Sequence, residues 1–589
     1  MDDTKNMILA IVLSMLVLFG YQYFVIGPEE EQARLQAEID SEGQVDDLSI
    51  DPGQMEIPGD AAGDIPAAPG AVNEAPAVLD VNRIPIDAPR LEGSISPIGG
   101  RIDSLVLKDY FDTIEPDSDN IVLLRKSGTP NAYFSNFGWV QGADGGVSLP
   151  DDDTVWRVNG DTLTTGTPVE LYWDNGDGMT FRKIISVDEN YMFTVRQVVE
   201  NRSDTPVTLA PFGMIRRTGT PDVLGFFILH EGPLGVVDGK LVDGDVDYDE
   251  LKDLYEDGDP PVSYRNTDGW LGFTDKFWLT SLIPDQTRPF NARFMYSRQN
   301  GLDQYQTDYV SQSETVIAGG RSEYVTNFFA GAKEVDLIDA YEESYNIPKF
   351  DLAIDWGWFY FLTRPIFYLL DYFFGLVGNF GVAILLLTVV IKLILFPLAN
   401  KSYRSMSRMK KLQPKMQALK ERYGDDKVKM QQETMALYKK EKANPAAGCL
   451  PMLLQFPVFF ALYKVLFVTI EMRHQPFFGW IQDLSAPDPV TVITGFGLID
   501  WSYPSWMSIF AIGIWPIMMG LTMHLQQKLN PQSPDPIQAK VFMFMPIIFT
   551  FILAPFPVGL VIYWTWNNLL SILQQWVIMK KEGVAHPAS

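Results

Sequence analysis

The residue whose type and position most suggest chemistry is Lys392, which lies inside the apolar run Val377–Leu398. About 20 apolar residues in a helix suffice to cross the hydrocarbon core of a bilayer. A charge inside such a helix costs at least ~2.5 kcal/mol, so it marks either a functional site or a side chain that extends to the interface. Both interpretations of Lys392 are open. For Lys464, in another apolar run, the sequence favours extension to the interface, because no polar cluster surrounds it.

Other polar residues in the apolar runs could lie close to Lys392. Thr388 is four residues earlier, on the same face of a helix. The remaining candidates are Gln455, Asn567, Asn568, Ser571, Gln574 and Gln575. If they converge, they form a hydrophilic concavity in the cytoplasmic half of a helical bundle. The alternative is that each makes a hydrogen bond between helices, which is common in membrane proteins.

Six membrane spans are expected to hold these residues. They are Met7–Ile26, Val377–Leu398, Gly448–Ile470, Trp506–Leu525, Val541–Ala554 and Gly559–Met579. The first is interpreted as an uncleaved anchor, because it is longer than the apolar part of a signal peptide and no small-residue cleavage site follows it. None of the six contains Asp or Glu, which argues against a proton- or sodium-coupled transporter.

Charge asymmetry predicts the orientation. Residues 399–445 carry 13 Lys/Arg against 5 Asp/Glu, whereas 471–505 carry only Arg473 as a basic residue. The positive-inside rule therefore places the basic loop and both termini in the cytoplasm. The aromatic segment Ile354–Phe374 is interrupted by charges and Pro365, so it is predicted to be an interfacial amphipathic helix.

A large acidic domain is predicted outside the cytoplasm. Residues 27–350 hold 24 Lys/Arg and 58 Asp/Glu, a charge that would repel nucleic acid. Residues 27–85 are rich in Pro, Ala and acidic residues, as linkers are. Beyond them, β-branched alternating runs and Asn-Gly or Asp-Gly pairs predict an antiparallel β-sandwich. One cysteine, Cys449, excludes an intramolecular disulfide, and the four scattered histidines predict no metal site.

The basic loop is predicted to be a helical hairpin, with helices at 400–423 and 426–443. Apolar residues recur there at spacings of three and four. On the first helix they are Met406, Met409, Leu412, Met416, Leu419 and Tyr423. On the second helix Val428, Met435 and Tyr438 are expected to face them. The basic outer faces either set topology alone or bind an acidic partner such as a ribosome or anionic lipid headgroups.

Residues 350–580 resemble the YidC membrane-protein insertase family. The motifs that carry the resemblance are Asn379-Phe380-Gly381, Lys392, Phe396-Pro397-Leu398, Leu412-Gln413-Pro414-Lys415, Gly424-Asp425-Asp426, Asn444–Cys449, Gln455-Phe456-Pro457, Asp483–Pro489 and Phe556–Trp564. The anchor and the β-domain resemble the Gram-negative form of the family, in which the outer compartment is the periplasm.

The resemblance implies a membrane insertase and chaperone, not an enzyme, and no cofactor. Its partners would be nascent membrane proteins, the Sec translocon, membrane lipids and the ribosome, the last through the hairpin. It also implies substrate-contact roles for Lys392, Thr388, Gln455, Tyr563, Trp564, Ile548 and Ile552. The family usually has Arg at the position of Lys392 and, in better-known members, Tyr at the position of Trp564.

The predicted fold is therefore a polytopic α-helical membrane bundle with a periplasmic antiparallel β-sandwich domain, located in the bacterial inner membrane. Its parts are an anchor (1–26), a linker (27–85), the β-domain (86–350), an interfacial helix (351–375), a five-span insertase core (376–580, with the hairpin at 399–445) and a short cytoplasmic tail (581–589). Two other functions are kept as alternatives: a small-solute transporter or channel, and a periplasmic domain that modifies sugars.

Overall fold

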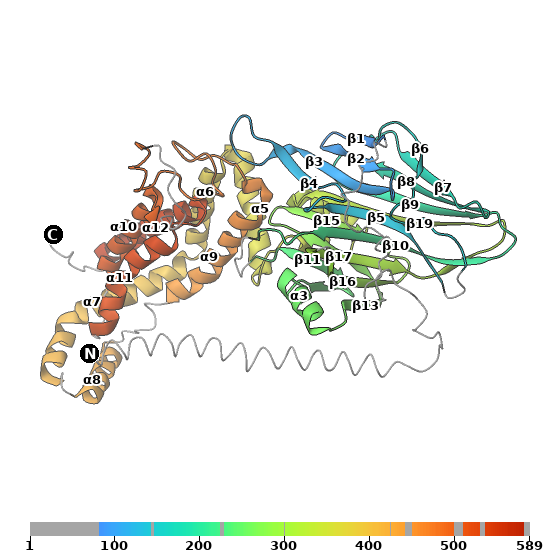
Figure 1. The fold of residues 1–589 in the computed structure, drawn as a ribbon. Helices are drawn as coiled ribbons and strands as arrows, with labels where there is room; N and C mark the ends of the chain where they lie inside the picture. Colours follow the sequence, from blue (N-terminus) through green and yellow to red (C-terminus); the bar gives the residue numbers. More distant parts are fainter. Residues whose placement is uncertain are drawn as a thin grey trace. The chain divides into compact units, whose positions relative to one another are not determined.

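The computed structural model describes residues 82–142, 146–223, 229–244, 246–299, 301–423, 426–441, 450–499, 510–530 and 536–581. The predicted anchor Met7–Ile26 and nearly all of the predicted linker lie outside these residues. The described chain contains an antiparallel β-domain followed by a series of helices (Figure 1). The predicted antiparallel β-domain and the helical C-terminal region are thus confirmed, whereas the number of spans stays a prediction.

Two antiparallel sheets form the β-domain. The first has the order β1 (Ile84–Asp87), β2 (Leu91–Ser96), β3 (Arg101–Phe111), β5 (Tyr133–Gln141), β10 (Val207–Thr218), β17 (Leu302–Ser311), β16 (Phe290–Gln299), β13 (Val262–Thr267), with β4 (Asn120–Leu124) beside β3 and β18 (Glu314–Val316) beside β10. The second has the order β12 (Lys240–Val242), β11 (Gly232–Val237), β14 (Gly269–Thr274), β15 (Trp278–Ile283), β19 (Arg321–Ala332), β9 (Met192–Asn201), β8 (Met179–Val187), β7 (Val169–Asp174), β6 (Arg157–Asn159).

The core of this domain lies between the two sheets. In β8 the side chains of Phe181, Lys183 and Ile185 alternate with less buried neighbours, as the period of two in a strand requires. Aromatic rings meet across the layers: Phe137 of β5 lies 6.1 Å from Phe328 of β19, centroid to centroid. The two sheets are therefore held by one shared apolar core.

Two helices accompany the sheets. Helix α3 (Tyr248–Asp257) begins at Asp247, whose side chain accepts a hydrogen bond from the Glu250 N–H, and ends at Gly258 with φ +80°. Helix α4 (Val335–Ser344) follows β19 directly, and its N-cap residue Glu334 makes no side-chain capping bond. The first turn of α4 therefore needs another acceptor for its free N–H groups.

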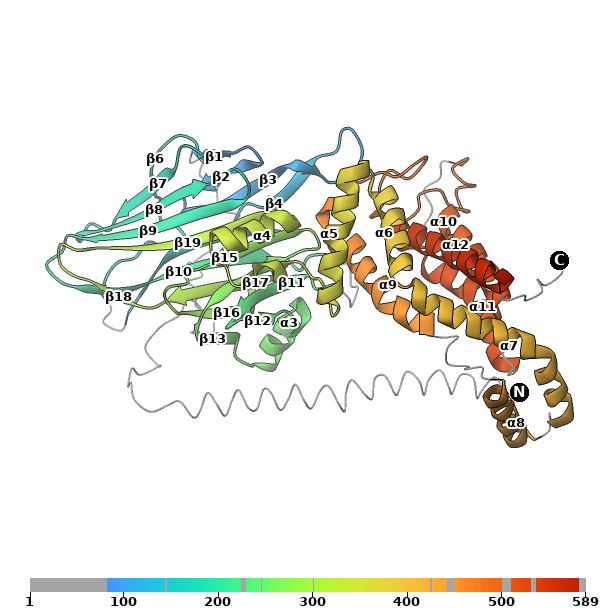
Figure 2. The same ribbon diagram turned by 180° about the vertical axis from the view of Figure 1, so that it is seen from behind.

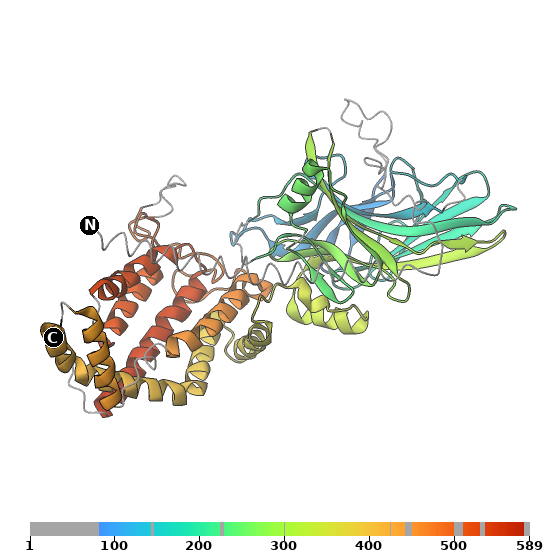
Figure 3. The same ribbon diagram turned by 90° about the horizontal axis from the view of Figure 1, so that it is seen from below.

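The C-terminal part is helical (Figures 2 and 3). Its elements are the 3₁₀ turn η2 (Phe350–Ala353), α5 (Tyr360–Val377), α6 (Phe380–Ile394), α7 (Phe396–Tyr423), α8 (Lys427–Lys440), α9 (Leu450–Val468), the 3₁₀ turn η4 (Ile470–Met472), α10 (Ile514–Leu529), α11 (Pro536–Ile552) and α12 (Val558–Lys581). Helix α12 packs against α6, α7, α9 and α10.

The predicted span Val377–Leu398 is not one straight helix. It divides into α6 and the start of α7, which meet at an angle of 69°. Pro397 lacks an N–H and disfavours helical geometry at Phe396, yet it is tolerated in the first turn of the next helix. Within the described part of the chain, only this bent pair reaches the length and hydropathy of a membrane span; every other helix falls short when taken alone.

Two further elements differ from their predicted limits. Helix α5 begins at Tyr360, because Gly357 adopts φ +71° just before it. The α5 face that includes Ile366 and Phe367 is buried, whereas Phe361 and Tyr372 on the other face are exposed, so α5 is aromatic on its exposed face as well. Helix α10 begins at Ile514, eight residues after the predicted Trp506.

Candidate functional site

Lys392 lies in the last turn of α6 and is bound to α12. Its Nζ donates a hydrogen bond to Ser571 Oγ over 2.7 Å. Ser571 is 1% exposed, and its hydroxyl donates to the Asn567 carbonyl oxygen over 2.8 Å. The hydroxyl therefore accepts from the ammonium with its lone pair while its proton is used within α12.

No described carboxylate lies within ion-pair distance of Lys392, although other lysines of the chain do form such pairs. An ammonium has three N–H donors, and Ser571 accepts one of them. A neutral hydroxyl orients the cation without cancelling its charge. The site can therefore attract an anionic group.

Polar residues on α12 form a buried stripe at a spacing of four, made of Asn567, Ser571 and Gln575. Beside it, Asn568 Nδ2 donates to Thr522 Oγ1 of α10 over 3.3 Å. Gln575 Nε2 donates to the carbonyl of Leu529 at the end of α10 over 3.1 Å. Part of the predicted polar cluster thus joins helices, and Ser571 is the member that reaches Lys392.

The other predicted site residues fall into separate groups. Thr388 is 1% exposed and donates to the Ile384 carbonyl of its own helix over 2.7 Å. Tyr563 is buried on α12 and forms a side-chain hydrogen bond with Gln455 of α9. Trp564 packs edge-on against Phe459 of α9, at 4.5 Å between ring centroids. Among the described contacts, none joins Lys392 directly to this α9–α12 group.

Ile548 and Ile552 are exposed on one face of α11. Their exposed fractions are 50% and 53%, and a spacing of four places them one above the other. This arrangement gives an apolar strip open to lipid or to another apolar helix. The substrate-contact roles of all seven residues remain predictions.

The hairpin of α7 and α8 is present, but its packing differs from the prediction. Tyr403, Met406, Met409 and Leu412 pack with Ile578 of α12. Val428 and Met435, which were expected to answer them, are 67% and 47% exposed. Tyr438 and Met416 do meet as predicted, and Tyr438 also packs against the α7 stripe. The Lys415–Glu441 ion pair of 2.7 Å adds a second contact between the two helices. The apolar stripe of α7 therefore serves to attach the hairpin to the bundle.

The premise of the Lys464 prediction, that no polar group surrounds this lysine, is wrong, and its extension to the interface stays a prediction. The Nζ of Lys464 lies 2.7 Å from Asp355 Oδ2, so the side chain ends in an ion pair. Asp355 lies outside every predicted span, in the connection before α5. A search for partners confined to the apolar runs could not find it.

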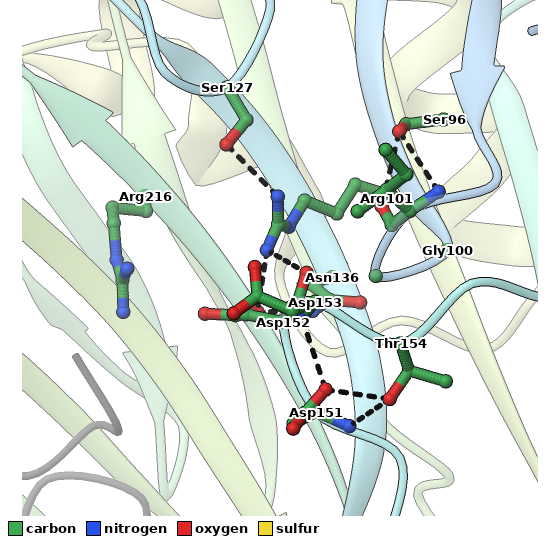
Figure 4. Close-up of polar contacts among 12 residues, drawn as sticks. Ser96, Gly100, Arg101, Ser127, Asn136, Asp151, Asp152, Asp153, Thr154 and Arg216 are labelled. Atoms are coloured by element: carbon green, nitrogen blue, oxygen red, sulfur yellow. Dashed lines mark hydrogen bonds and ion pairs between the residues drawn. The ribbon is translucent and has the colours of Figure 1, made fainter. Parts of the chain in front are cut away.

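A second polar cluster lies in the β-domain (Figure 4). Arg101 donates to Ser127 Oγ over 3.1 Å and pairs with Asp152 Oδ1 at 2.9 Å. Asn136 Nδ2 also donates to Asp152, over 3.3 Å. Burial opposes ionisation, yet Arg101 and Arg216 hold the pKa of Asp152 below its ordinary value. An ionised carboxylate fixed by arginine is a poor general acid or base near neutral pH.

Lys183 extends the same cluster into the core. Its Nζ donates to the Gly99 carbonyl and to Asn136 Oδ1, each over 3.0 Å. Burial, with Arg101 nearby, lowers the pKa of Lys183 to about 7. No histidine is among the residues labelled in Figure 4. His230 donates from Nε2 to the Pro233 carbonyl over 2.7 Å. Across the described residues, no group of three or more His, Cys, Asp or Glu side chains could hold a metal ion.

Comparison with known proteins identifies both halves of the chain. Residues 83–369 match the model of the YidC periplasmic domain, and residues 372–584 match that of the 60Kd inner membrane protein. Proteins named membrane protein insertase YidC are 48% identical in Methylorubrum extorquens (99% of this chain, 96% of the relative) and 49% in Beijerinckia indica (99% and 97%). The one from Rhizobium meliloti is 48% identical (99% and 97%).

Solved structures add more distant similarities. A crystal structure of an active YidC insertase with the first transmembrane domain resolved aligns with 84% of this chain and 92% of its own, at 18% identity and a TM-score of 0.35. A putative aldose 1-epimerase from Escherichia coli aligns with 42% of this chain and 98% of its own, at 10% identity and a TM-score of 0.29.

The fold and the two matched models define an inner-membrane protein that carries a periplasmic β-rich domain. Within that class, the chain belongs to the YidC family of membrane protein insertases. The resemblance found in the sequence is therefore confirmed.

Proposed function

We propose that this protein inserts hydrophobic segments of nascent membrane proteins into the bacterial inner membrane through a hydrophilic groove that contains Lys392. The observation that carries the proposal is the ammonium of Lys392, which is oriented by the neutral Ser571 Oγ at 2.7 Å. Carrying a polar client segment across about 30 Å of hydrocarbon is prohibitive for unpaired backbone groups and charges. A polar groove within the bundle shortens that path.

Two parts of the client would contact two different surfaces of the protein. Its polar flank would contact the groove at Lys392 and the α12 stripe, because a cation without a carboxylate partner attracts acidic side chains. Its apolar segment would lie along Ile548 and Ile552 of α11, which are half exposed. Gln455, Tyr563 and Trp564 would contact the client where α9 meets α12, and Thr388 would do so only if its hydroxyl leaves the Ile384 carbonyl.

The topology proposed with this function has both termini and the α7–α8 hairpin in the cytoplasm. The basic surface of the hairpin supports docking of a ribosome or of anionic lipid headgroups. Cooperation with the Sec translocon, in addition to independent action, is part of the proposal and rests on family membership. Client burial in lipid and the membrane potential would supply the driving force.

The direct test replaces the groove charge. Lys392→Ala and Lys392→Arg are compared with Lys240→Ala, an exposed lysine on β12, in cells depleted of the wild-type protein. Insertion of a single-span client is scored by protease protection, with acidic or neutral residues in its translocated tail. We expect Lys392→Ala to slow insertion of the acidic client about tenfold, equivalent to roughly 1.4 kcal/mol. Lys392→Arg and Lys240→Ala should stay within about twofold of the wild type.

Two results would count against the groove mechanism. One is normal insertion of both clients by Lys392→Ala. The other is an equal loss for both clients, because a charge effect depends on the acidic tail. A solute transporter would in addition show substrate flux through the purified protein in vesicles without any client.

A further inference from the structure

The outer end of α9 is joined to the chain before α5 by an ion pair whose lysine is buried and whose carboxylate is partly exposed. Lys464 is 9% exposed, and its Nζ lies 2.7 Å from Asp355 Oδ2. Lys464 follows Gln455 by nine residues on the same helix, a separation of about 13 Å along its axis. The same helix therefore carries both Lys464 and the residues that contact α12.

The carboxylate of Asp355 is held from three directions. Its Oδ1 accepts a hydrogen bond from the Gly357 N–H over 3.1 Å, and its Oδ2 accepts one from the His230 N–H over 3.3 Å. The third partner is Lys464. Since His230 belongs to the β-domain, this single carboxylate joins the β-domain, the connection before α5 and helix α9.

The stem of Lys464 is fitted against Gly357. A Cβ atom at position 357 would lie 2.8 Å from Lys464 Cε and 3.3 Å from its Cγ. Gly357 also has φ +71°, a conformation that other residues adopt at a cost. Both the head and the stem of the lysine are thus fixed, which a side chain that merely reaches toward solvent would not need.

Three more contacts bind the same end of α9 and the turn after it. Lys276 Nζ lies 3.9 Å from the ring centroid of Phe467. Arg473 Nη2 donates to the Asp112 carbonyl over 3.0 Å. Glu471 Oε1 accepts the Val335 N–H over 2.8 Å, and so supplies the acceptor that the first turn of α4 lacks.

We infer that Lys464 and Asp355 are positioning residues for insertion. The pair fixes the outer end of α9 and thereby the register in which Gln455 and Phe459 meet Tyr563 and Trp564 on α12. Neither residue needs to touch the client. The pair acts on every client alike, whereas the Lys392 charge acts on acidic clients.

The energetics of the pair give a specific test. Removing the Asp355 carboxylate takes the ion-pair partner from the buried Lys464 ammonium, whereas removing both partners leaves no charge of the pair to desolvate. We compare Lys464→Met, Asp355→Asn and the double variant in the full-length protein, with Glu343→Gln, an exposed carboxylate on α4, as control. Insertion of the acidic and the neutral client is scored at matched membrane levels of each variant.

We expect each single variant to slow insertion of both clients about fivefold, and the double variant to return within twofold of the wild type. Lys464→Arg, which keeps the charge, should also insert well. The insertion assay presupposes the proposed insertase function, so the inference rests on that function. Lys392→Ala is therefore assayed in parallel. A defect of Lys392→Ala limited to the acidic client tests the groove separately from the pair.

Melting of the purified variants provides a second readout. We expect both single variants to melt below the wild type and the double variant to melt close to it. Wild-type insertion by both single variants would overturn the inference. So would a double variant that is about 25-fold slower than the wild type, the product of two fivefold defects, because the two residues would then act independently.

Discussion

Lys392 and Lys464 show how differently two lysines in apolar helices are accommodated. Lys392 is bound by a neutral hydroxyl, so its charge is available to a ligand. Lys464 is bound by a carboxylate, so its charge is used within the fold. The sequence alone presents both as a cation in an apolar run. Only the partner, which the sequence does not reveal, distinguishes the two lysines.

The carboxyl group of Glu471, just after α9, has a pKa well above its ordinary value. Burial raises its pKa to about 7, and the nearby carboxylates Glu334 and Asp336 add to the rise, although the Val335 N–H opposes it. Of these neighbours, Glu334 is itself bound by Arg90 and Tyr110. Between its ordinary value and about 7, the folded protein therefore binds more protons at Glu471 than the unfolded chain does.

The free energy of unfolding should therefore decrease as the pH rises from the ordinary pKa of a glutamate to about 7. The contribution of Glu471 is complete below about pH 4.5 and is lost by about pH 7, with a span of up to about 3 kcal/mol. Glu471→Gln stays neutral and keeps an oxygen acceptor for the Val335 N–H. We expect the variant to flatten the fall in melting temperature between pH 5 and pH 8, whereas Glu343→Gln should not. An unchanged slope in Glu471→Gln would show that Glu471 is ionised throughout.

At the scale of elements, the start of α6 depends on close packing. Asn379 caps the helix by accepting the Val382 N–H over 3.0 Å. Two residues later, Gly381 lies against the ring of Phe477, so that a Cβ at this position would overlap with Cδ2. The absence of a side chain thus lets the loop after α9 pack onto α6.

Gly381→Ala should therefore destabilise the protein by about 1–3 kcal/mol, because the ring or the helix must shift. Gly375→Ala on α5 is the matched control, since nothing lies within 4 Å of its added Cβ. There the better helix propensity of alanine predicts a neutral or slightly stabilising effect of up to about 1 kcal/mol. Denaturation of the purified proteins in detergent measures both. Equal stability of the two variants would mean that the ring of Phe477 moves aside without a loss of stability.

The sequence predicted which helices are present more accurately than it predicted the residues at which they begin and end. The apolar runs that become α9, α11 and α12 were found because hydrophobic content needs no knowledge of tertiary structure. The bend at Phe396 was missed, although Pro397 is visible in the sequence, because the run is apolar on both sides of it. The stripe of Met406, Met409 and Leu412 and its partner Tyr438 were recognised, but Ile578 of α12 was not, because periodicity identifies a face and not everything that covers it.

At the scale of the whole molecule, the groove residues and the β-domain belong to different segments. Lys392, Ser571, Gln455 and Tyr563 all lie within residues 372–584, the segment matched by the inner-membrane protein model. Asp355 lies just before that segment. A deletion that ends before Asp355 therefore keeps the Asp355–Lys464 pair, while it removes Asp112, Lys276 and Val335.

We expect deletion of residues 30–340 to leave insertion of single-span clients within about threefold of the wild type. The loss should come from the contacts of Arg473 and Glu471, which would no longer have their partners. Pulse labelling with protease protection in depleted cells measures the rate at matched membrane levels. Complete loss of insertion by a stably integrated deletion variant would place an essential function in the β-domain. If the deletion abolished a sugar-modifying activity and left insertion intact, the result would support the alternative that the β-domain is an enzyme.

The sequence by itself determined the partition of the chain into an acidic β-rich domain and an apolar helical part with a basic hairpin, and its motifs identified the family. These properties follow from composition, local periodicity and residue order, which do not depend on how the chain folds back on itself. The tertiary structure alone decided that Lys392 meets Ser571, 179 residues away, and that Lys464 meets Asp355. Such pairs depend on which helices pack together and at which angle, and no local pattern encodes that geometry.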